Sequence, residues 1–329
     1  RGRRGHGRGG GPGDLLIRFA PHDPARIRRE LRDRLAAGGP TLQLPGALSP
    51  LVARAVQDAG FGGVYLSGGA LSAELGLPDV GLTTLSEVVD RARRVATATS
   101  LPTIVDADTG FGEALNAART MQELERAGVA GCHLEDQENP KRCGHLAGKR
   151  LVEPAAMERT LRAAAAARHD PRFLLIARTD ARAVDGLDAA IERARAYLAA
   201  GADAIFPEAL QDEDEFRAFR AAIDAPLLAN MTEFGRSPLL DHATLTDLGY
   251  EMAIYPVTTL RLAMGAIERG LRVLREEGTQ QGLVPGMQTR ARLYELIGYD
   301  EHAAFDQEAY GGAAVDDGED GSDDPAGGG

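Results

Sequence analysis

The sequence has few lysines, cysteines and aromatic residues, and it has no long apolar run. Its 329 residues include two lysines, two cysteines and no tryptophan, and aromatic residues make up 5% of the chain. Two cysteines do not build a disulfide scaffold, and they fit a reducing, cytoplasmic compartment. The apolar runs are far shorter than a membrane span and no secretory signal opens the chain, so we expect no membrane contact.

Basic residues are outnumbered too, because 37 of them face 49 acidic residues and the formal net charge at pH 7 is −12. A chain this acidic is not expected to bind nucleic acid. Both lysines, Lys141 and Lys149, lie in one short stretch of the chain. No predicted strand therefore carries the desolvated lysine that a Schiff-base aldolase requires.

The two ends of the chain have the composition of disordered segments. Residues 1–13 are Gly and Arg with almost nothing apolar, and residues 313–329 are rich in Gly and Asp without any aromatic residue. We expect the first to be a solvated tail and the second an acidic, solubilising one. Between them, residues 14–312 are expected to form a single domain, since 43% hydrophobic residues are ample for a core.

Short apolar runs alternate with helical patterns through this domain. Ser49-Pro50 and the capping-box spacing of Thr84 and Glu87 mark helix starts, and Pro154 and Pro238 are expected to begin further helices. Continuous apolar strands between helices are typical of a parallel sheet that is covered on both faces. Eight such units in about 230 residues predict a (β/α)8 TIM-type barrel. The predicted strands are 41–44, 64–67, 103–106, 131–135, 174–178, 204–207, 227–230 and 253–257.

Helical patterns also lie outside the eightfold count. One precedes the barrel at 24–37, with apolar residues at a spacing of four, and is expected on the surface. Two follow it, at 287–297 and 302–308. The two C-terminal helices could pack on the barrel or on a neighbouring subunit.

Polar residues follow six consecutive predicted strands. Barrel enzymes place their chemistry at the carboxyl ends of the strands. Six polar ends in succession exceed what solvation explains, because charges in a buried mouth need partners. These residues are Ser67, Gly68 and Gly69; Asp106 and Asp108; Glu135; Arg178; Glu208; and Asn230 with Thr232.

The acidic members of this set predict a metal site. Asp106 and Asp108 share a strand parity, so both can face the mouth. With Glu135 and Asp79 they form an all-oxygen cluster that suits Mg²⁺ or Mn²⁺. Without a cation these like charges would repel one another. The alternative is that one aspartate caps the following helix.

The basic members predict an anionic substrate. Arg178 ends an apolar strand, and an arginine fork binds a carboxylate in a bidentate way. Arg261 and Arg290 could serve the same purpose, although each lies on a helix where a surface position is equally compatible. The Ser67-Gly68-Gly69 turn offers backbone donors for an anion, or is a plain tight turn. A small, multiply anionic substrate fits this set.

The loop after the fourth strand contains a thiol in basic surroundings. Cys143 lies beside Lys141, Arg142 and His145, and such a positive field lowers a thiol pKa. Gly144 lets the backbone approach a ligand closely. If carbon–carbon cleavage occurs here, a proton donor must quench the carbanion, and Cys143 is the candidate. The alternative is a charged surface loop with a bystander cysteine.

These residues resemble a known family. The run from Lys141 to His145 is similar to the signature of the isocitrate lyase and phosphoenolpyruvate mutase superfamily, and the resemblance covers residues 41–307. The segments 206–209, 228–235 and 287–290 resemble its 2-methylisocitrate lyase branch. Further matching segments are 65–69, 77–79, 105–112 and 177–180.

The resemblance implies a homotetramer whose last barrel helix is swapped between subunits. It implies Mg²⁺ held near Asp106 and Asp108, with Asp79 and Glu135 close by, partly through water. It also implies a small tricarboxylate substrate bound by a larger set of residues. That set is Ser67, Gly68, Gly69, Cys143, Gly144, Arg178, Glu208, Asn230, Thr232, Arg261 and Arg290.

The implied reaction is the retro-aldol cleavage of 2-methylisocitrate to pyruvate and succinate, in the methylcitrate route of propionate breakdown. Tyr65 or a metal-linked carboxylate would remove the hydroxyl proton. His145 and an arginine would stabilise the developing charge, and Cys143 would then donate its proton.

Three alternatives stay open. Isocitrate lyases share the cysteine loop but usually carry an insertion in the barrel, whereas one helix separates the fourth and fifth strands here. Phosphonopyruvate-type enzymes and oxaloacetate decarboxylases share the aspartates but generally lack the whole run around Cys143. A catalytically inactive barrel scaffold would be expected to have lost a catalytic residue, yet Cys143, Asp106, Asp108 and Arg178 are all present.

Overall fold

The computed structural model describes residues 22–142, 144 and 148–310. The chain divides into two compact units, of which the larger is Ala20–Met287 and the smaller includes the helices after Gln288. The predicted tails, 1–13 and 313–329, lie outside the described residues. Among the described helices, none is long and apolar enough to cross a membrane.

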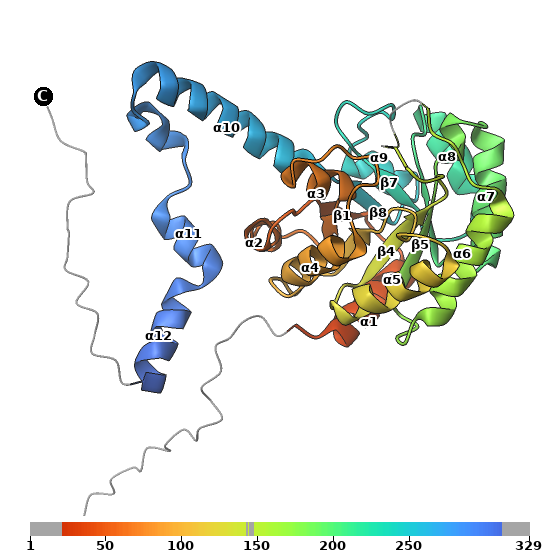
Figure 1. The fold of residues 1–329 in the computed structure, drawn as a ribbon, viewed down its shortest axis with the longest axis horizontal. Helices are drawn as coiled ribbons and strands as arrows, with labels where there is room; N and C mark the ends of the chain where they lie inside the picture. The colour runs from red at the N-terminus through yellow and green to blue at the C-terminus, as the bar shows by residue number, and fades with distance from the viewer. Residues whose placement is uncertain (1–21, 143, 145–147, 311–329) are drawn as a thin grey trace, which may run out of the picture. The chain divides into compact units, whose positions relative to one another are not determined.

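The larger unit is an eight-stranded parallel barrel, as the sequence predicts (Figure 1). Hydrogen-bonded pairing runs from β2 through β3, β4 and β5 to β6, and from β7 through β8 to β1. Parallel bridges join Gly46 to Tyr65 and Ile205 to Leu227, which closes the ring. The strands are β1 Leu42–Pro45, β2 Val64–Leu66, β3 Thr103–Asp106, β4 Gly131–Glu135, β5 Leu174–Thr179, β6 Ala204–Pro207, β7 Leu228–Asn230 and β8 Met252–Tyr255.

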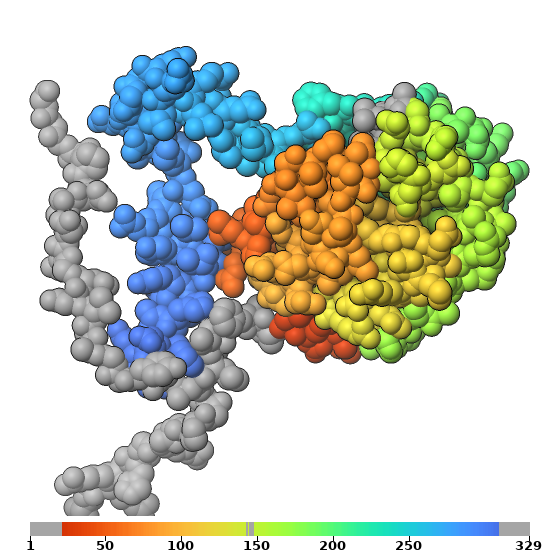
Figure 2. All heavy atoms as spheres, viewed as in Figure 1, coloured from red at the N-terminus to blue at the C-terminus, as the bar shows by residue number. Residues whose placement is uncertain are grey.

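Helices follow the strands and largely begin where the sequence predicts. Ser49 accepts a hydrogen bond from the Val52 amide, and Thr84 with Glu87 forms a complete capping box. The side chains of α3, α4 and α5 close over one side of the barrel (Figure 2). The helices around the barrel are α2 Pro50–Asp58, α3 Gly68–Glu74, α4 Leu85–Ala96, α5 Ala114–Arg126, α6 Pro154–Ala167, α7 Leu187–Ala199, α8 Glu213–Ala222 and α9 His242–Asp247.

Two local predictions were wrong. Pro238 does not begin a helix, because α9 starts at His242 after Asp241, whose carboxylate accepts a hydrogen bond from the Thr244 amide. The turn after β2 is not only a turn, since Ser67 caps the short helix α3 by accepting from the Ala70 amide. A side-chain cap overrides the weak helix propensity of two glycines.

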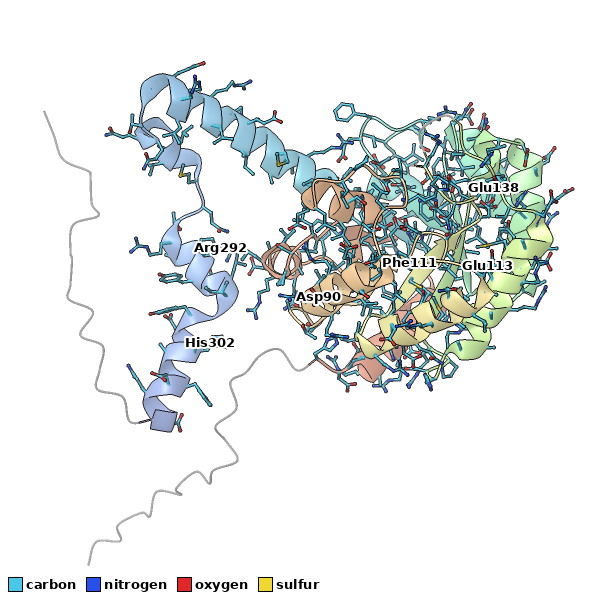
Figure 3. All side chains as sticks on the ribbon, viewed as in Figure 1. Asp90, Phe111, Glu113, Glu138, Arg292 and His302 are labelled. Carbon is cyan, nitrogen blue, oxygen red and sulfur yellow. The ribbon has the colours of Figure 1, made fainter. Side chains whose placement is uncertain are left out.

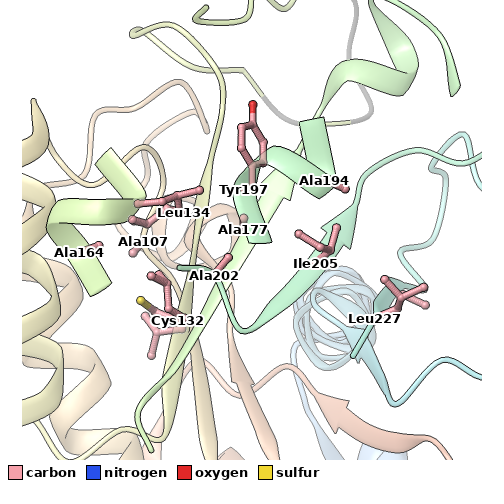
Figure 4. Close-up of a cluster of buried hydrophobic side chains, with 14 of the residues drawn as sticks. Ala107, Cys132, Leu134, Ala164, Ala177, Ala194, Tyr197, Ala202, Ile205 and Leu227 are labelled. Carbon is pink, nitrogen blue, oxygen red and sulfur yellow. The ribbon is translucent and has the colours of Figure 1, made fainter. Parts of the chain in front are cut away.

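Side-chain alternation along the strands separates two apolar layers. Tyr65, Ile104 and Phe206 point into the barrel, whereas Val105 and Leu134 point outward against the helices. Figure 4 shows this outer layer, where side chains of β4, β5 and β6 pack on α6 and α7. The residues that continue the inward rows past the last apolar layer are Asp106, Glu135, Arg178 and Glu208, so the strand period itself delivers them to the mouth.

The N-terminal helix α1, Pro24–Ala37, has the predicted bounds but is not simply a surface element. Its Ile27, Leu31 and Leu35 are buried in the same apolar cluster as the barrel interior. Arg28 is also buried, and it donates hydrogen bonds to the carbonyl oxygens of Val129 at 3.0 Å and Glu125 at 2.7 Å. The helix therefore closes the amino-terminal end of the barrel and leaves the other end for chemistry.

Gly131 at the start of β4 is expected to tolerate no side chain. A β-carbon there would lie 2.5 Å from the Leu174 carbonyl oxygen and 2.7 Å from the Leu174 β-carbon. Gly131→Ala should therefore force β4 and β5 apart and lower the free energy of unfolding by about 1–3 kcal/mol. Urea unfolding monitored by circular dichroism measures this. Gly286→Ala, where a β-carbon meets nothing within 4 Å, is the matched control and should be neutral.

Helix α10, Thr258–Glu277, follows β8, and its first turn contacts the barrel, where the Thr259 hydroxyl donates a hydrogen bond to the Gly46 carbonyl oxygen. The rest of the helix extends away from the barrel (Figure 1). None of its residues is buried within the described chain, and its side chains project into the open (Figure 3). Exposed apolar residues nevertheless recur along one face at Met264, Ile267, Leu271 and Leu274. A helix with such a face is normally covered by another surface.

The smaller unit contains two helices where the sequence predicts two. Helix α11 is Arg290–Ile297, so it begins three residues later than predicted, after a cap in which Thr289 accepts from the Arg292 amide. Helix α12 is Tyr299–Tyr310, longer than predicted. The rings of Tyr294 and Tyr299 stack with their centroids 4.5 Å apart.

Candidate active site

The carboxyl ends of the strands enclose a small polar cavity of about 80 Å³. Most residues that the sequence predicts for the site line it. From β2 and its loop these are Tyr65, Ser67, Gly69 and Asp79, and from the other strand ends they are Asp106, Gly144, Arg178, Glu208, Asn230 and Thr232. Phe206, Ile254, Pro256 and Val257 supply an apolar wall. The cavity therefore combines charged groups with one apolar side.

The two aspartates after β3 face the mouth in the predicted way but have different surroundings. Asp106 accepts hydrogen bonds from the amides of Gly68 and Asp108, both at 3.1 Å. Asp108 lines a separate hollow of about 640 Å³ and accepts from the Thr83 hydroxyl at 3.4 Å. The loop that follows is tightly turned, because Asp108 and Phe111, the latter labelled in Figure 3, have φ angles of +47° and +60°. Such angles cost energy and are typical of functional loops.

Lys141 lies among the carboxylates that the sequence assigns to a metal. Its ammonium is 2.8 Å from Asp108 Oδ1 and forms a short ion pair with Asp79. Burial alone would lower the pKa of Lys141, but Glu135, Asp108 and the other acids raise it well above its usual value. Lys141 is therefore a committed cation here, paired with carboxylates of other loops.

The acids at the mouth titrate at different pH values. Burial would raise the pKa of Asp106, but nearby His133, Lys141 and Arg178 lower it to about 2. Burial together with the Asp106 charge raises the pKa of Asp108 to about 6. Burial also raises the pKa of Glu135 well above its usual value. Asp106 is thus the most firmly ionised acid of the group, whereas burial makes ionisation of Asp108 and Glu135 less favourable than in water.

These residues fit a divalent cation. Glu135 is fully buried, and its Oε1 has no hydrogen-bond partner among the described residues. The cluster has four carboxylates, of Asp79, Asp106, Asp108 and Glu135, and the cations paired with them are Lys141 and Arg178. Hard oxygen donors of this kind suit Mg²⁺. No three acidic, histidine or cysteine side chains in the described chain already surround a common point. Binding would therefore require Asp108 and Asp79 to exchange Lys141 for the ion.

Arg178 is the central cation of the cavity. Its Nη1 lies 3.1 Å from Glu135 Oε2 and its Nη2 lies 3.4 Å from Glu208 Oε2. Asp180 accepts from Nε at 3.0 Å and from Nη2 at 3.2 Å. The guanidinium also lies 5.2 Å from the centroid of the Phe206 ring. Burial alone would lower the pKa of Arg178, but Asp180, Glu135 and Glu208 raise it, so the arginine is a fixed positive charge.

Glu208 and Asn230 form the opposite side of the cavity. Asn230 Nδ2 is 3.2 Å from Glu208 Oε2, and the Ala209 amide donates to Glu208 Oε1 at 2.9 Å. Thr232 follows on the same rim. Neutral donors beside Arg178 suit the oxygen atoms of a substrate that carries several carboxylates.

Tyr65 is held by a residue that the sequence reasoning missed. Its hydroxyl is 2.7 Å from His133 Nε2, and both side chains are buried. Burial and the Asp106 charge raise the pKa of Tyr65 well above its usual value, while burial lowers the pKa of His133 to about 4. The pair is therefore a neutral phenol beside a neutral imidazole. His133 has the same inward parity as Glu135, which is the signal that could have predicted it.

Arg261, which the sequence also predicts for the site, does not line this cavity. Arg261 pairs with Glu233 at 3.7 Å and lies over the Phe234 ring at 5.0 Å. Arg290 begins α11 and belongs to the smaller unit. Cys143 and His145 lie outside the described residues. Their contacts with substrate, like the others, stay predictions.

The second cysteine does not compete with Cys143. Cys132 is a free thiol on β4 that is fully buried, 3.8 Å from the Met121 sulfur. Burial raises its pKa, so it stays a protonated, unreactive thiol at neutral pH. Any thiol chemistry of the native protein therefore belongs to Cys143.

Known proteins resemble this chain over most of its length. The phosphoenolpyruvate phosphomutase family model matches residues 31–275. A probable 2-methylisocitrate lyase of Corynebacterium glutamicum is 58% identical over 88% of this chain and 94% of its own. The 2-methylisocitrate lyase of Halalkalibacterium halodurans is 50% identical over 86% of this chain and 94% of its own.

Solved structures agree with the sequence relatives. A 2,3-dimethylmalate lyase, a member of the PEP mutase/isocitrate lyase superfamily, superposes with a TM-score of 0.82 at 34% identity, over 89% of this chain and 97% of its own. Phosphonopyruvate hydrolase in complex with oxalate and Mg²⁺ superposes with a TM-score of 0.79 at 31% identity, over 87% of this chain and 99% of its own. With its parallel barrel and its carboxylate-lined mouth, the chain belongs to the phosphoenolpyruvate phosphomutase and isocitrate lyase superfamily, beside the 2-methylisocitrate lyases.

Proposed function

We propose that the protein is a Mg²⁺-dependent carbon–carbon lyase that cleaves 2-methylisocitrate to pyruvate and succinate. The proposal rests on one observation, which is that Arg178, Glu208 and Asn230 meet the ionised Asp106 around a single cavity with an apolar wall. Arginine and amide donors suit the carboxylates of the substrate, and the apolar wall suits its methyl group. The high identity to 2-methylisocitrate lyases supports the same substrate.

Asp106, Asp108, Asp79 and Glu135 would hold the cation. Phosphonopyruvate hydrolase, a relative of the same fold, has been solved with Mg²⁺. Bound in this acidic cluster, Mg²⁺ would supply a Lewis acid that stabilises negative charge on a substrate oxygen. Lys141 would then be released from Asp79 and Asp108 and become available to the substrate.

The protein side chains carry the remaining steps. Arg178 binds a substrate carboxylate, and Asn230 and Thr232 orient the other oxygen atoms. Tyr65 starts protonated and bound to His133, so of the two candidate bases a metal-linked carboxylate is the better acceptor for the hydroxyl proton. The electrons of the broken carbon–carbon bond remain on the carbon that becomes a methylene group of succinate. Cys143 protonates that carbon, while His145 and Arg178 stabilise the charge of its carboxylate.

A parallel assay of two substrates tests this function. Pyruvate from 2-methylisocitrate and glyoxylate from isocitrate should be measured on the same preparation, with EDTA treatment and Mg²⁺ addition as a reversal. We expect pyruvate formation that EDTA abolishes and Mg²⁺ restores, with isocitrate cleaved at least about tenfold less efficiently because one methylene group discriminates by this order. Efficient glyoxylate formation would favour an isocitrate lyase, and cleavage of neither acid would favour an inactive scaffold.

We also propose that residues 14–312 act as one domain in a homotetramer in which α10 is exchanged between paired subunits. Its exposed apolar face requires cover, and an apolar cavity of about 350 Å³ lies beside β8, lined by Val52, Val56, Phe61 and Tyr255 among others. A second copy of α10 is the occupant, since the helix carries an exposed apolar face and none of its residues is buried in the described chain. The free thiol of Cys132 and the low cysteine count are consistent with a cytoplasmic enzyme.

Changing the apolar face of α10 should dissociate the oligomer. Leu271→Glu would place a charge among the side chains that the exchange buries, so we expect a smaller species in size-exclusion chromatography with light scattering. The barrel should remain folded by circular dichroism. Arg272→Glu, one residue along on the same helix, is the control and should leave the mass unchanged. An unaltered mass for Leu271→Glu would contradict the exchange.

A further inference from the structure

Lys149 has contacts that the mechanism above does not use. Its ammonium lies 2.8 Å from Asp180 Oδ1 and forms a short hydrogen bond to the carbonyl oxygen of Gly144. The residue is 8% exposed, and lysine is almost never this buried without a partner. A buried ammonium that joins one backbone carbonyl to one carboxylate fixes the distance between them.

Both ends of this connection are anchored in the barrel. The residues that follow Lys149 pair with the strand extension after β4, because Gln137 bridges Leu151 and the Glu138 amide donates to the Arg150 carbonyl at 2.8 Å. Asp180 is held through its own amide, which donates to Asp136 Oδ1 at 2.9 Å. The positions of Lys149 and Asp180 are therefore fixed by the barrel, and the Lys149 ammonium extends from there to the Gly144 carbonyl oxygen.

Gly144 is pressed against the substrate side of the cavity. A β-carbon at this position would lie 2.3 Å from Arg178 Nη2 and 2.6 Å from Glu208 Cγ. Asp180, the other partner of Lys149, is also the carboxylate that holds the Arg178 guanidinium. Lys149 thus connects the backbone of Gly144, the residue after Cys143, to Asp180, the carboxylate that holds Arg178.

We propose that Lys149 is a positioning residue that sets the backbone of Gly144, and with it the neighbouring proton donor, relative to Arg178. This inference rests on the proposed lyase function for its catalytic consequence but not for its structural one. Lys149 itself is not among the residues that line the cavity. Its loss should therefore affect the chemical step more than substrate binding.

Lys149→Met tests the proposal because it removes the ammonium and keeps the length and the apolar stem. Asp180 retains its hydrogen bonds from Arg178, so the fold should persist. We expect kcat to fall about 10- to 100-fold with KM changed less than about threefold, since small misplacement of a reacting group costs this much. Lys149→Arg, which still donates to Asp180, should recover part of the loss. Arg150→Met, an exposed neighbour whose side chain is 74% accessible, is the control.

A second readout does not depend on activity. We expect iodoacetamide labelling to report on Cys143, because the other cysteine, Cys132, is buried with a raised pKa. Releasing Gly144 should raise the labelling rate of the full-length Lys149→Met protein about tenfold, the size expected when a charged hydrogen bond is lost. A labelling rate equal to that of the wild type and of Arg150→Met overturns the positioning role, whatever happens to kcat. Absent lyase activity in the wild type would instead overturn the proposed function and leave the labelling comparison valid.

Discussion

Cys143→Ser is expected to bind Mg²⁺ and substrate like the wild type and to turn over about 1,000-fold more slowly, since a positioned acid contributes about 100- to 10,000-fold. The oxygen of serine fits where sulfur did, but a hydroxyl is a far weaker acid than a thiol. The carbanion left by carbon–carbon cleavage would then lack its proton donor, while the groups that bind the carboxylates stay in place. Single-turnover kinetics and calorimetric titration with substrate measure the two effects separately.

The matched control is Cys132→Ser, which changes the other cysteine of the chain. Cys132 lies outside the cavity against the Met121 sulfur, so any effect should appear in thermal stability rather than in kcat. Full activity of Cys143→Ser would remove the cysteine from the mechanism. It would leave His145 or a water molecule as the proton donor.

Arg178→Lys should be the most damaging change that preserves charge. Arg178 contacts Glu135, Asp180 and Glu208 at once, and a single ammonium cannot reproduce this fork. Losing one partner of a buried charge pair costs about 2–5 kcal/mol, so kcat/KM should fall at least about 30-fold. Because positive charge remains among the acids, the barrel should stay folded, which thermal unfolding can verify.

Arg182→Lys is a close control for this substitution. Arg182 also forms a two-pronged pair, with Glu215, but it lies beyond the cavity after β5. Its replacement should lower stability and leave kcat/KM within about twofold, because this partly buried pair does not line the cavity. Equal losses for the two variants would show that Arg178 has a structural role only.

The barrel could be predicted because each of its strands coincides with a short apolar run in the sequence. Each predicted strand overlaps an observed one, and the parity of residues such as Asp106 and Arg178 correctly places them at the mouth. Local signals also predicted the caps at Ser49 and Thr84. These features depend on neighbours in sequence, which is why periodicity suffices for them.

The features that were missed depend on partners far away in the chain. Lys141 meets Asp79, which is 62 residues earlier, and His133 meets Tyr65, which is 68 residues earlier. The local sequence around Lys141 does not indicate that its ammonium will pair with aspartates of other loops. The helix at Gly68 was missed for another reason, because glycine propensity conceals a helix that a serine cap begins.

The burial of both lysines also determines how the protein reacts with reagents that modify amines. Lys141 and Lys149 are 3% and 8% exposed and ion-paired, so the described surface presents guanidinium groups but no side-chain amine. Acylating reagents such as succinimidyl esters attack only a neutral, accessible amine. They should therefore leave both lysines of the folded, metal-free protein unmodified, and lysine acylation would report that these ion pairs have broken.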